Sequence, residues 1–154
     1  MTPFRYTLVA LLFLALSGCN EDETPNPYTA NRQVYALSQS SDFPVSGTAT
    51  FLERRDGQVE IRIALTGTEG DIQHPAHLHE GDVSATDSEV ALMLSPVSGI
   101  TGESVTLVSR LNDETNVTYA DMIRFAGHIK VHLDADVNKS VILASGNVGS
   151  LAAN

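Results

Sequence analysis

Short runs in which every second residue is apolar occupy most of the chain between residues 33 and 148. This alternation is typical of β-strands with one buried face, whereas an amphipathic helix repeats about every 3.6 residues. The runs are rich in β-branched residues and are separated by turn signals such as Arg55-Asp56-Gly57. They cover residues 33–39, 47–53, 58–65, 89–94, 104–110, 128–133 and 140–148, and the histidine-rich stretch 73–82 adds another. The pattern predicts an all-β fold, a Greek-key β-sandwich or barrel of about eight strands.

One segment favours a helix instead. In residues 118–126, TYADMIRFA, Thr118 suits the N-cap position and Asp121 follows at the spacing of a capping box. The segment is long enough for about one to two turns. We therefore expect one short helix that connects two strands.

The N-terminal segment MTPFRYTLVALLFLALSGC has one cation, Arg5, before an apolar run from Tyr6 to Leu16. A membrane-spanning helix needs about 20 apolar residues, so this run is typical of an export signal. The small residues before Cys19, the only cysteine of the chain, resemble a bacterial lipobox. The resemblance implies a lipoprotein signal peptide at residues 1–18 and a lipid anchor on Cys19. The exported protein would then be anchored in a bacterial membrane, facing the periplasm or the cell surface. Ordinary secretion with a free Cys19 is the alternative.

Residues 19–31 are acidic and rich in proline and asparagine, which predicts a flexible tether. Residues 32–154 then form one domain with enough chain for a hydrophobic core. The formal net charge of −10 repels phosphate backbones, so we expect no nucleic acid partner. A homodimer or an unknown protein partner stays open.

Three of the five histidines lie in the stretch QHPAHLHEGD, residues 73–82. On a strand, His77 and His79 share one face, and Ala76 and Leu78 share the other. A later strand repeats the arrangement, because His128, Lys130 and His132 alternate with Ile129, Val131 and Leu133. The apolar residues are expected to face the core, so these imidazoles are predicted to point outward. His74 is out of phase with His77 and is expected to face elsewhere.

A single outward histidine is an ordinary surface residue, but two histidines two positions apart are harder to explain in that way. Their Cα atoms start roughly 6.6 Å apart, so both side chains can converge on one ion. A third histidine on the later strand would complete the site. His128 and His132 are roughly 13 Å apart along an extended strand, so one ion cannot easily take both. We therefore expect three ligands.

Three imidazoles limit the chemistry of such a site. Neutral nitrogen ligands suit copper, zinc or nickel, and the predicted domain has no cysteine for a closed zinc site. A three-histidine site leaves a coordination position open, where copper can change oxidation state and zinc can act as a Lewis acid.

Several segments resemble Cu,Zn superoxide dismutases. HLHEGD is similar to their copper-binding strand HVHE-x-GD, and ILASGNVGSLA is similar to their last strand, LACGVIGIA. GHIKVHLDADVN resembles the strand in which a third copper histidine precedes an aspartate by four residues. This resemblance implies copper ligands at His77, His79 and His132, and a carboxylate at Asp136 that orients the ligand imidazoles. His128 lies near a position where some bacterial members carry histidine, which makes it an additional candidate.

The residues that these enzymes use to bind zinc, to guide the anion and to form the disulfide are replaced in this chain. The histidine that bridges copper and zinc falls at Met93, and the next zinc histidine falls at Thr101. The guiding arginine falls at Ile142, and the disulfide cysteine of that strand falls at Ser145. The chain is therefore more similar to the CHRD domain, a superoxide dismutase-like β-sandwich of secreted bacterial proteins that lacks the zinc loop.

Three functions are compatible with this pattern. The first is a non-enzymatic copper-binding or copper-handling module, in which copper is preferred to zinc and Met93 helps to hold Cu(I). The alternative interpretation of Met93 is that it is an ordinary core residue of its strand. The second is a copper-only superoxide dismutase, which the net charge of −10 and Ile142 disfavour. The third is a metal-free adhesion or scaffold module.

Overall fold

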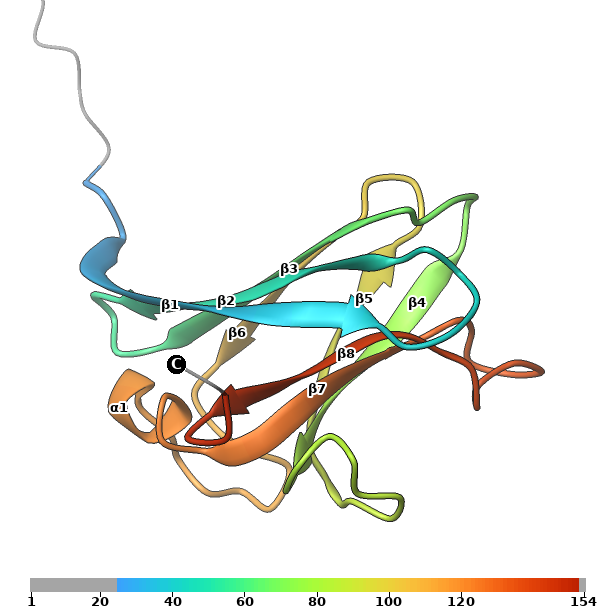
Figure 1. The fold of residues 1–154 in the computed structure, drawn as a ribbon. Coiled ribbons are helices and arrows are strands. Elements are labelled where there is room, and N and C mark those ends of the chain that lie inside the picture. Colours follow the sequence, from blue (N-terminus) through green and yellow to red (C-terminus); the bar gives the residue numbers. More distant parts are fainter. Residues whose placement is uncertain (1–24, 153–154) are drawn as a thin grey trace, which may run out of the picture.

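The computed structural model describes residues 25–152. The predicted signal peptide, the predicted lipidation site Cys19 and the first part of the predicted tether lie outside these residues. The described chain forms eight antiparallel strands and one short helix, which confirms the all-β prediction (Figure 1). The elements are β1 (Tyr28–Gln39), β2 (Ser46–Arg54), β3 (Val59–Thr66), β4 (Gln73–Glu80), β5 (Val90–Ser98), β6 (Glu103–Val108), α1 (Tyr119–Met122), β7 (Ala126–His132) and β8 (Ile142–Gly149).

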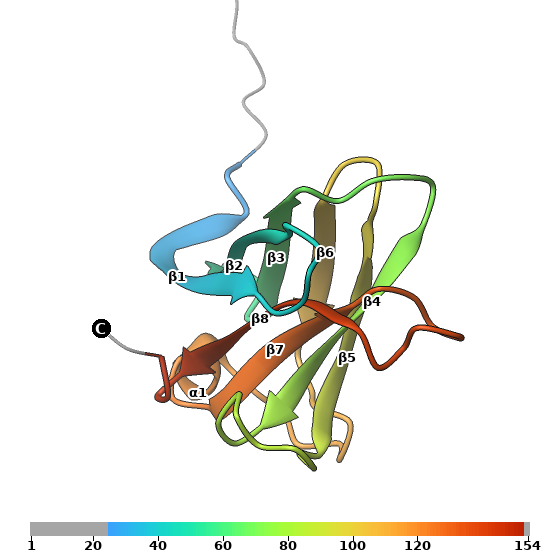
Figure 2. The same ribbon diagram turned by 45° about the vertical axis from the view of Figure 1, so that its right-hand side comes forward.

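The strands follow the order β5-β4-β7-β8-β1-β2-β3-β6 in one strongly curved sheet (Figures 1 and 2). The two edge strands approach each other, because Ser95 on β5 donates its backbone N–H to Thr106 Oγ1 on β6 at 2.8 Å. The sheet is therefore a nearly closed barrel. β7 lies beside β4 and not beside β6, which is the Greek-key connection of four successive strands.

β1 joins the two halves of the barrel. Most of its length pairs with β2, and its last residues, Ser38 and Gln39, pair with β8. The strand begins at Tyr28, so residues 28–31 of the predicted tether belong to the sheet. The Tyr28 hydroxyl lies 2.9 and 3.0 Å from the carboxylate oxygens of the buried Glu60 on β3. This contact fixes the start of the strand, and composition alone does not reveal it.

The core lies inside the barrel and is built from the inward-facing residues of the alternating strands. Phe51, Ile61, Leu78 and Ile129 each retain at most 1% of their accessible surface. Each such side chain contributes about 1.5–3 kcal/mol of hydrophobic stabilisation relative to an exposed position.

The connecting helix α1 is shorter than residues 118–126 and forms a single turn. Its predicted capping box is present, because Asp121 N–H bonds Thr118 Oγ1 and Thr118 N–H bonds the Asp121 carboxylate. The helix ends early because Ala126 already pairs with Gly149 in the ladder of β7 and β8. Within residues 25–152, no helix is long and apolar enough to cross a membrane.

Candidate metal centre

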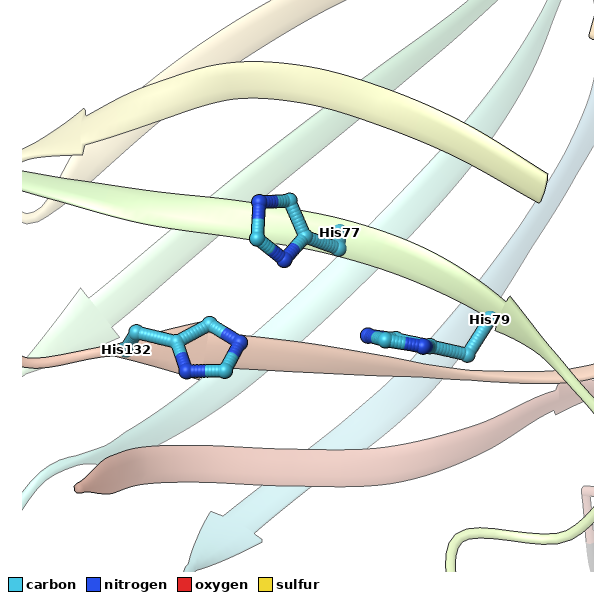
Figure 3. A group of neighbouring side chains, drawn as sticks. All are labelled: His77, His79 and His132. Atoms are coloured by element: carbon cyan, nitrogen blue, oxygen red, sulfur yellow. The ribbon is translucent and has the colours of Figure 1, made fainter. Parts of the chain in front are cut away.

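Two neighbouring strands, β4 and β7, carry the predicted ligands. They run antiparallel, with His77 opposite Lys130 and His79 opposite His128. His132 lies at the end of β7, and Figure 3 shows its ring side by side with that of His77, while His79 approaches from the other side. Ligand nitrogens of His77, His79 and His132 lie within 4.8 Å of one another. The chain therefore contains a three-histidine cluster that can hold a metal ion.

The strand faces agree with the alternation in the sequence. Ala76 and Leu78 are 1% and 0% exposed, so they face the core, while His77 and His79 face the opposite side of β4. His79 is nevertheless only 8% exposed. The loop between β4 and β5 covers it, since the carbonyl oxygen of Ser88 lies 3.1 Å from His79 Nδ1.

Irregular pairing occurs beside two of the three histidines. The register of β4 and β5 shifts between Leu78 and His79, and the register of β7 and β8 shifts between Val131 and His132. Such bulges bend a strand locally and change the direction of the side chain that follows. The two shifts thus help to bring His79 and His132 toward His77.

Main-chain carbonyl groups define the tautomers of two imidazoles. His132 Nδ1 lies 2.7 Å from the carbonyl oxygen of Lys139, just as His79 Nδ1 bonds that of Ser88. A carbonyl oxygen only accepts, so each Nδ1 carries the proton and each Nε2 presents a lone pair. Both Nε2 atoms are buried and have no hydrogen-bond partner among the described residues. An unpaired buried acceptor costs about 1–3 kcal/mol, and a metal ion would relieve that cost.

The electrostatics of the cluster favour neutral imidazoles. Burial, together with smaller contributions from the neighbouring His132 and His79, lowers the pKa of His77 from 6.5 to about 4. Burial also lowers the pKa of His79, against the opposing effect of its bond to Ser88. Because a metal ion binds the neutral form, protons compete weakly with metal for His77 and His79 at neutral pH.

His128 lies next to the cluster but is not part of it. The side chain is fully buried, and its ring stacks on that of His79 with centroids 5.1 Å apart and an angle of 6°. His128 Nδ1 lies 2.8 Å from the carbonyl oxygen of Gly81, and Nε2 lies 3.4 Å from Ser88 Oγ. His128, the additional candidate, therefore supports the His79 ring from the side.

Met93 is the direct neighbour of His77 on β5. Its side chain is 57% exposed, so the interpretation of Met93 as a core residue is wrong. The buried residues of β5 on either side of Met93 are Ala91 and Leu94, whose spacing of three positions departs from strict alternation. Met93 and the two histidines His77 and His132 line the same cavity, which leaves Met93 available as an additional soft ligand.

Asp136 does not take the orienting role that the resemblance implied. It is exposed, and no hydrogen bond joins its carboxylate to an imidazole in residues 25–152. The carbonyl of Lys139 fills this role for His132, and Asp134 holds the loop by accepting bonds from the backbone of Asp136 and Asn138. No sequence pattern identifies Lys139 or Ser88, because every residue type supplies a carbonyl group.

His74 faces the core, as its phase on β4 predicted. It is 2% exposed, and its Nδ1 lies 2.7 Å from the carbonyl oxygen of Leu133. It therefore acts as a buried structural histidine outside the cluster.

Comparisons of the chain with protein-family models, with curated proteins and with solved structures found no match. The cluster of His77, His79 and His132 is consequently defined by its geometry alone. Two anchored imidazoles and a third beside them form a site that can bind a transition-metal ion and leave part of its coordination sphere open.

Proposed function

We propose that this chain binds a copper ion through His77, His79 and His132 and acts as a non-enzymatic copper-binding or copper-handling module. The observation that carries the proposal is the pair of buried, unpartnered Nε2 atoms on His79 and His132, held toward a third imidazole. His74 Nε2 is also buried and without a partner in the described chain, but His74 lies outside the cluster, so the site is distinguished by the convergence of three histidine nitrogens within 4.8 Å of one another.

Copper is preferred to zinc because of the donor atoms around the cluster. Structural zinc sites are usually closed by four ligands that include thiolates, and the described chain contains no cysteine. Met93 adds a thioether beside His77, and soft sulfur ligands favour Cu(I). When bound, copper would supply a one-electron redox couple at the open coordination position.

The proposal places this module on a bacterial membrane, facing the periplasm or the cell surface. Its support is the N-terminal sequence, in which a short apolar run precedes the single Cys19. By the sequence resemblance described above, the folded part would be a CHRD-type domain. Labelling with a radioactive fatty acid tests the anchor, and loss of label in Cys19→Ser is the expected result.

Electron paramagnetic resonance tests the copper site. Metal-free protein mixed with equimolar Cu(II) should show hyperfine structure from nitrogen ligands, and a zinc competition should leave copper in place. Loss of a residue that only hydrogen-bonds to a metal ligand weakens metal binding roughly 10–100-fold. His77→Ala removes a ligand itself, so it should weaken copper binding by more than that. His74→Gln is the matched control, because it removes a histidine of the same strand that lies outside the cluster.

An unchanged spectrum in His77→Ala, or the absence of nitrogen hyperfine structure in the unmodified protein, would contradict the proposal. Either result would leave a metal-free adhesion or scaffold module as the function.

Copper-only superoxide dismutation is a second candidate, and the position of Lys130 is the observation that favours it. Lys130 lies opposite His77 in the ladder, and its charge contributes, after burial, to the lowered pKa of His79. A cation next to an open metal position can attract a small anion even when the whole protein is acidic. If copper-loaded protein consumes superoxide faster than free copper, and Lys130→Gln slows it and weakens its dependence on ionic strength, this candidate replaces the module.

A further inference from the structure

A cavity of about 600 Å³ lies beside the histidine cluster. Its lining includes His77 from β4 and His132 from β7, whose ring centroids are 5.0 Å apart, and the two rings lie together in Figure 3. His79 does not line it, so the cavity meets the cluster from one side. Small-molecule sites usually enclose roughly 300–1,000 Å³. The cavity is therefore larger than one ion needs and has the size of an organic ligand site.

Apolar residues make up most of the remaining wall. They come from β4, from β5 and from the loop after β7, and they are Pro75, Ala76, Met93, Leu94, Pro96 and Ala135. Ala76 and Leu94 belong to the core, so Pro75, Met93, Pro96 and Ala135 supply most of the apolar surface that a ligand can reach. Met93, which is 57% exposed, offers apolar surface that a ligand can cover. Covering apolar surface contributes about 25 cal/mol per Å², so this wall favours an apolar ligand body.

The charged groups of the wall balance each other. The lining contains one cationic side chain, Lys139, and one anionic side chain, Asp134. The Asp134 carboxylate accepts hydrogen bonds from Asn138 N and Nδ2 at 3.0 and 2.8 Å, which holds it in its own loop. An anionic ligand would meet this carboxylate, and a cationic ligand would meet Lys139. The wall therefore favours an uncharged ligand.

We propose that this cavity binds an uncharged, largely apolar small molecule. The body of the ligand packs against Pro75, Pro96 and Met93, and one edge lies against His77 and His132. The inference goes beyond copper binding and does not require it, because the volume and the lining belong to the chain itself.

Three naphthalene probes of equal shape test the ligand class. Metal-free protein is titrated with naphthalenemethanol, naphthoate and naphthylmethylammonium, and binding is followed by the probe's own fluorescence, since the chain has no tryptophan. Naphthalenemethanol should bind most tightly. Tighter binding of either charged probe, or no binding of any probe, overturns the proposal. Because no metal is present, failure of the copper proposal does not affect this readout.

Two matched serine variants test the location. Met93→Ser should weaken binding of naphthalenemethanol at least about five-fold through loss of apolar contact. Leu107→Ser should leave it unchanged, because Leu107 is similarly exposed, at 52%, but lies on β6 outside the cavity. In NMR spectra, the probe should shift the imidazole signals of His77 and His132. Equal losses in both variants, or shifts confined to other parts of the chain, overturn the proposal.

Discussion

His79 and His128 lie directly opposite each other on β4 and β7, and their imidazole rings stack almost parallel, 5.1 Å apart. Only His79 belongs to the cluster that can hold a metal ion. His128 is bonded to the main chain at Gly81 and has no accessible surface. The second ring therefore fixes the position of the first.

Substitution of His128 should weaken metal binding without removing a ligand. His128→Phe keeps an aromatic ring in the stack but loses the hydrogen bond to Gly81, so His79 is held less firmly. We expect copper affinity to fall about ten-fold, the usual cost of a lost outer partner, with altered hyperfine constants in the paramagnetic resonance spectrum. Circular dichroism checks that the barrel is intact. An unchanged spectrum and affinity would show that the stack serves stability alone.

The pKa of His77 predicts how stability depends on pH. This pKa is lowered to about 4 in the folded chain, compared with 6.5 for an ordinary histidine. Between these two values the unfolded chain binds a proton that the folded chain does not, so acidification through this window lowers the free energy of unfolding. Urea unfolding near neutral pH and near pH 5 measures the free energy of unfolding that is lost on acidification. This loss should be smaller in His77→Gln than in the unmodified protein.

An NMR titration of the metal-free protein checks the same pKa directly. The His77 imidazole should stay neutral until the pH approaches about 4. A midpoint near 6.5, the ordinary histidine value, would contradict the burial and the repulsion from His132 and His79 as its causes.

Met93 should distinguish the two oxidation states of copper. Met93→Leu keeps an apolar side chain opposite His77 and removes the sulfur. We expect weaker binding of Cu(I) and little change for Cu(II), because the thioether is a soft ligand. Competition with a Cu(I)-specific chelator measures the first affinity, and competition with glycine measures the second. Equal effects on both would mean that the sulfur does not approach the metal.

The buried Glu60 should be important for stability. Arg62 Nε donates to its carboxylate at 2.6 Å, Arg54 Nη1 does so at 3.3 Å, and the Tyr28 hydroxyl adds a further bond. Glu60→Leu removes these hydrogen bonds, but Arg62 is partly hydrated and Arg54 keeps its ion pair with Asp56, so we expect a loss of about 1.5–3 kcal/mol in urea unfolding. The matched control is Glu114→Gln, which breaks an exposed ion pair with Arg110 and should cost less than about 1 kcal/mol.

The sequence predicted the strands and their faces well, because alternation records which side of a sheet is buried. It thus placed His77 and His79 together on one face of β4 and His132 on the same side of the sheet. Alternation does not show how each strand bends in the closed barrel or which loops cover its outer face. Met93 reads like a core residue, but β5 turns it outward, and a covering loop buries His79 on a face where exposure was expected. The carbonyl groups of Ser88 and Lys139 carry no side-chain signature at all.

β1 has a mechanical consequence for the site. A force applied at Tyr28 acts along the strand, so the ladder with β2 is loaded in shear before the two pairs with β8 at Ser38 and Gln39. The histidine strands β4 and β7 lie beyond β8 in the sheet order. Tension on the N-terminal end of the barrel would therefore be borne by the half of the sheet that contains no cluster residue, and the spacing of the three imidazoles would be insulated from it.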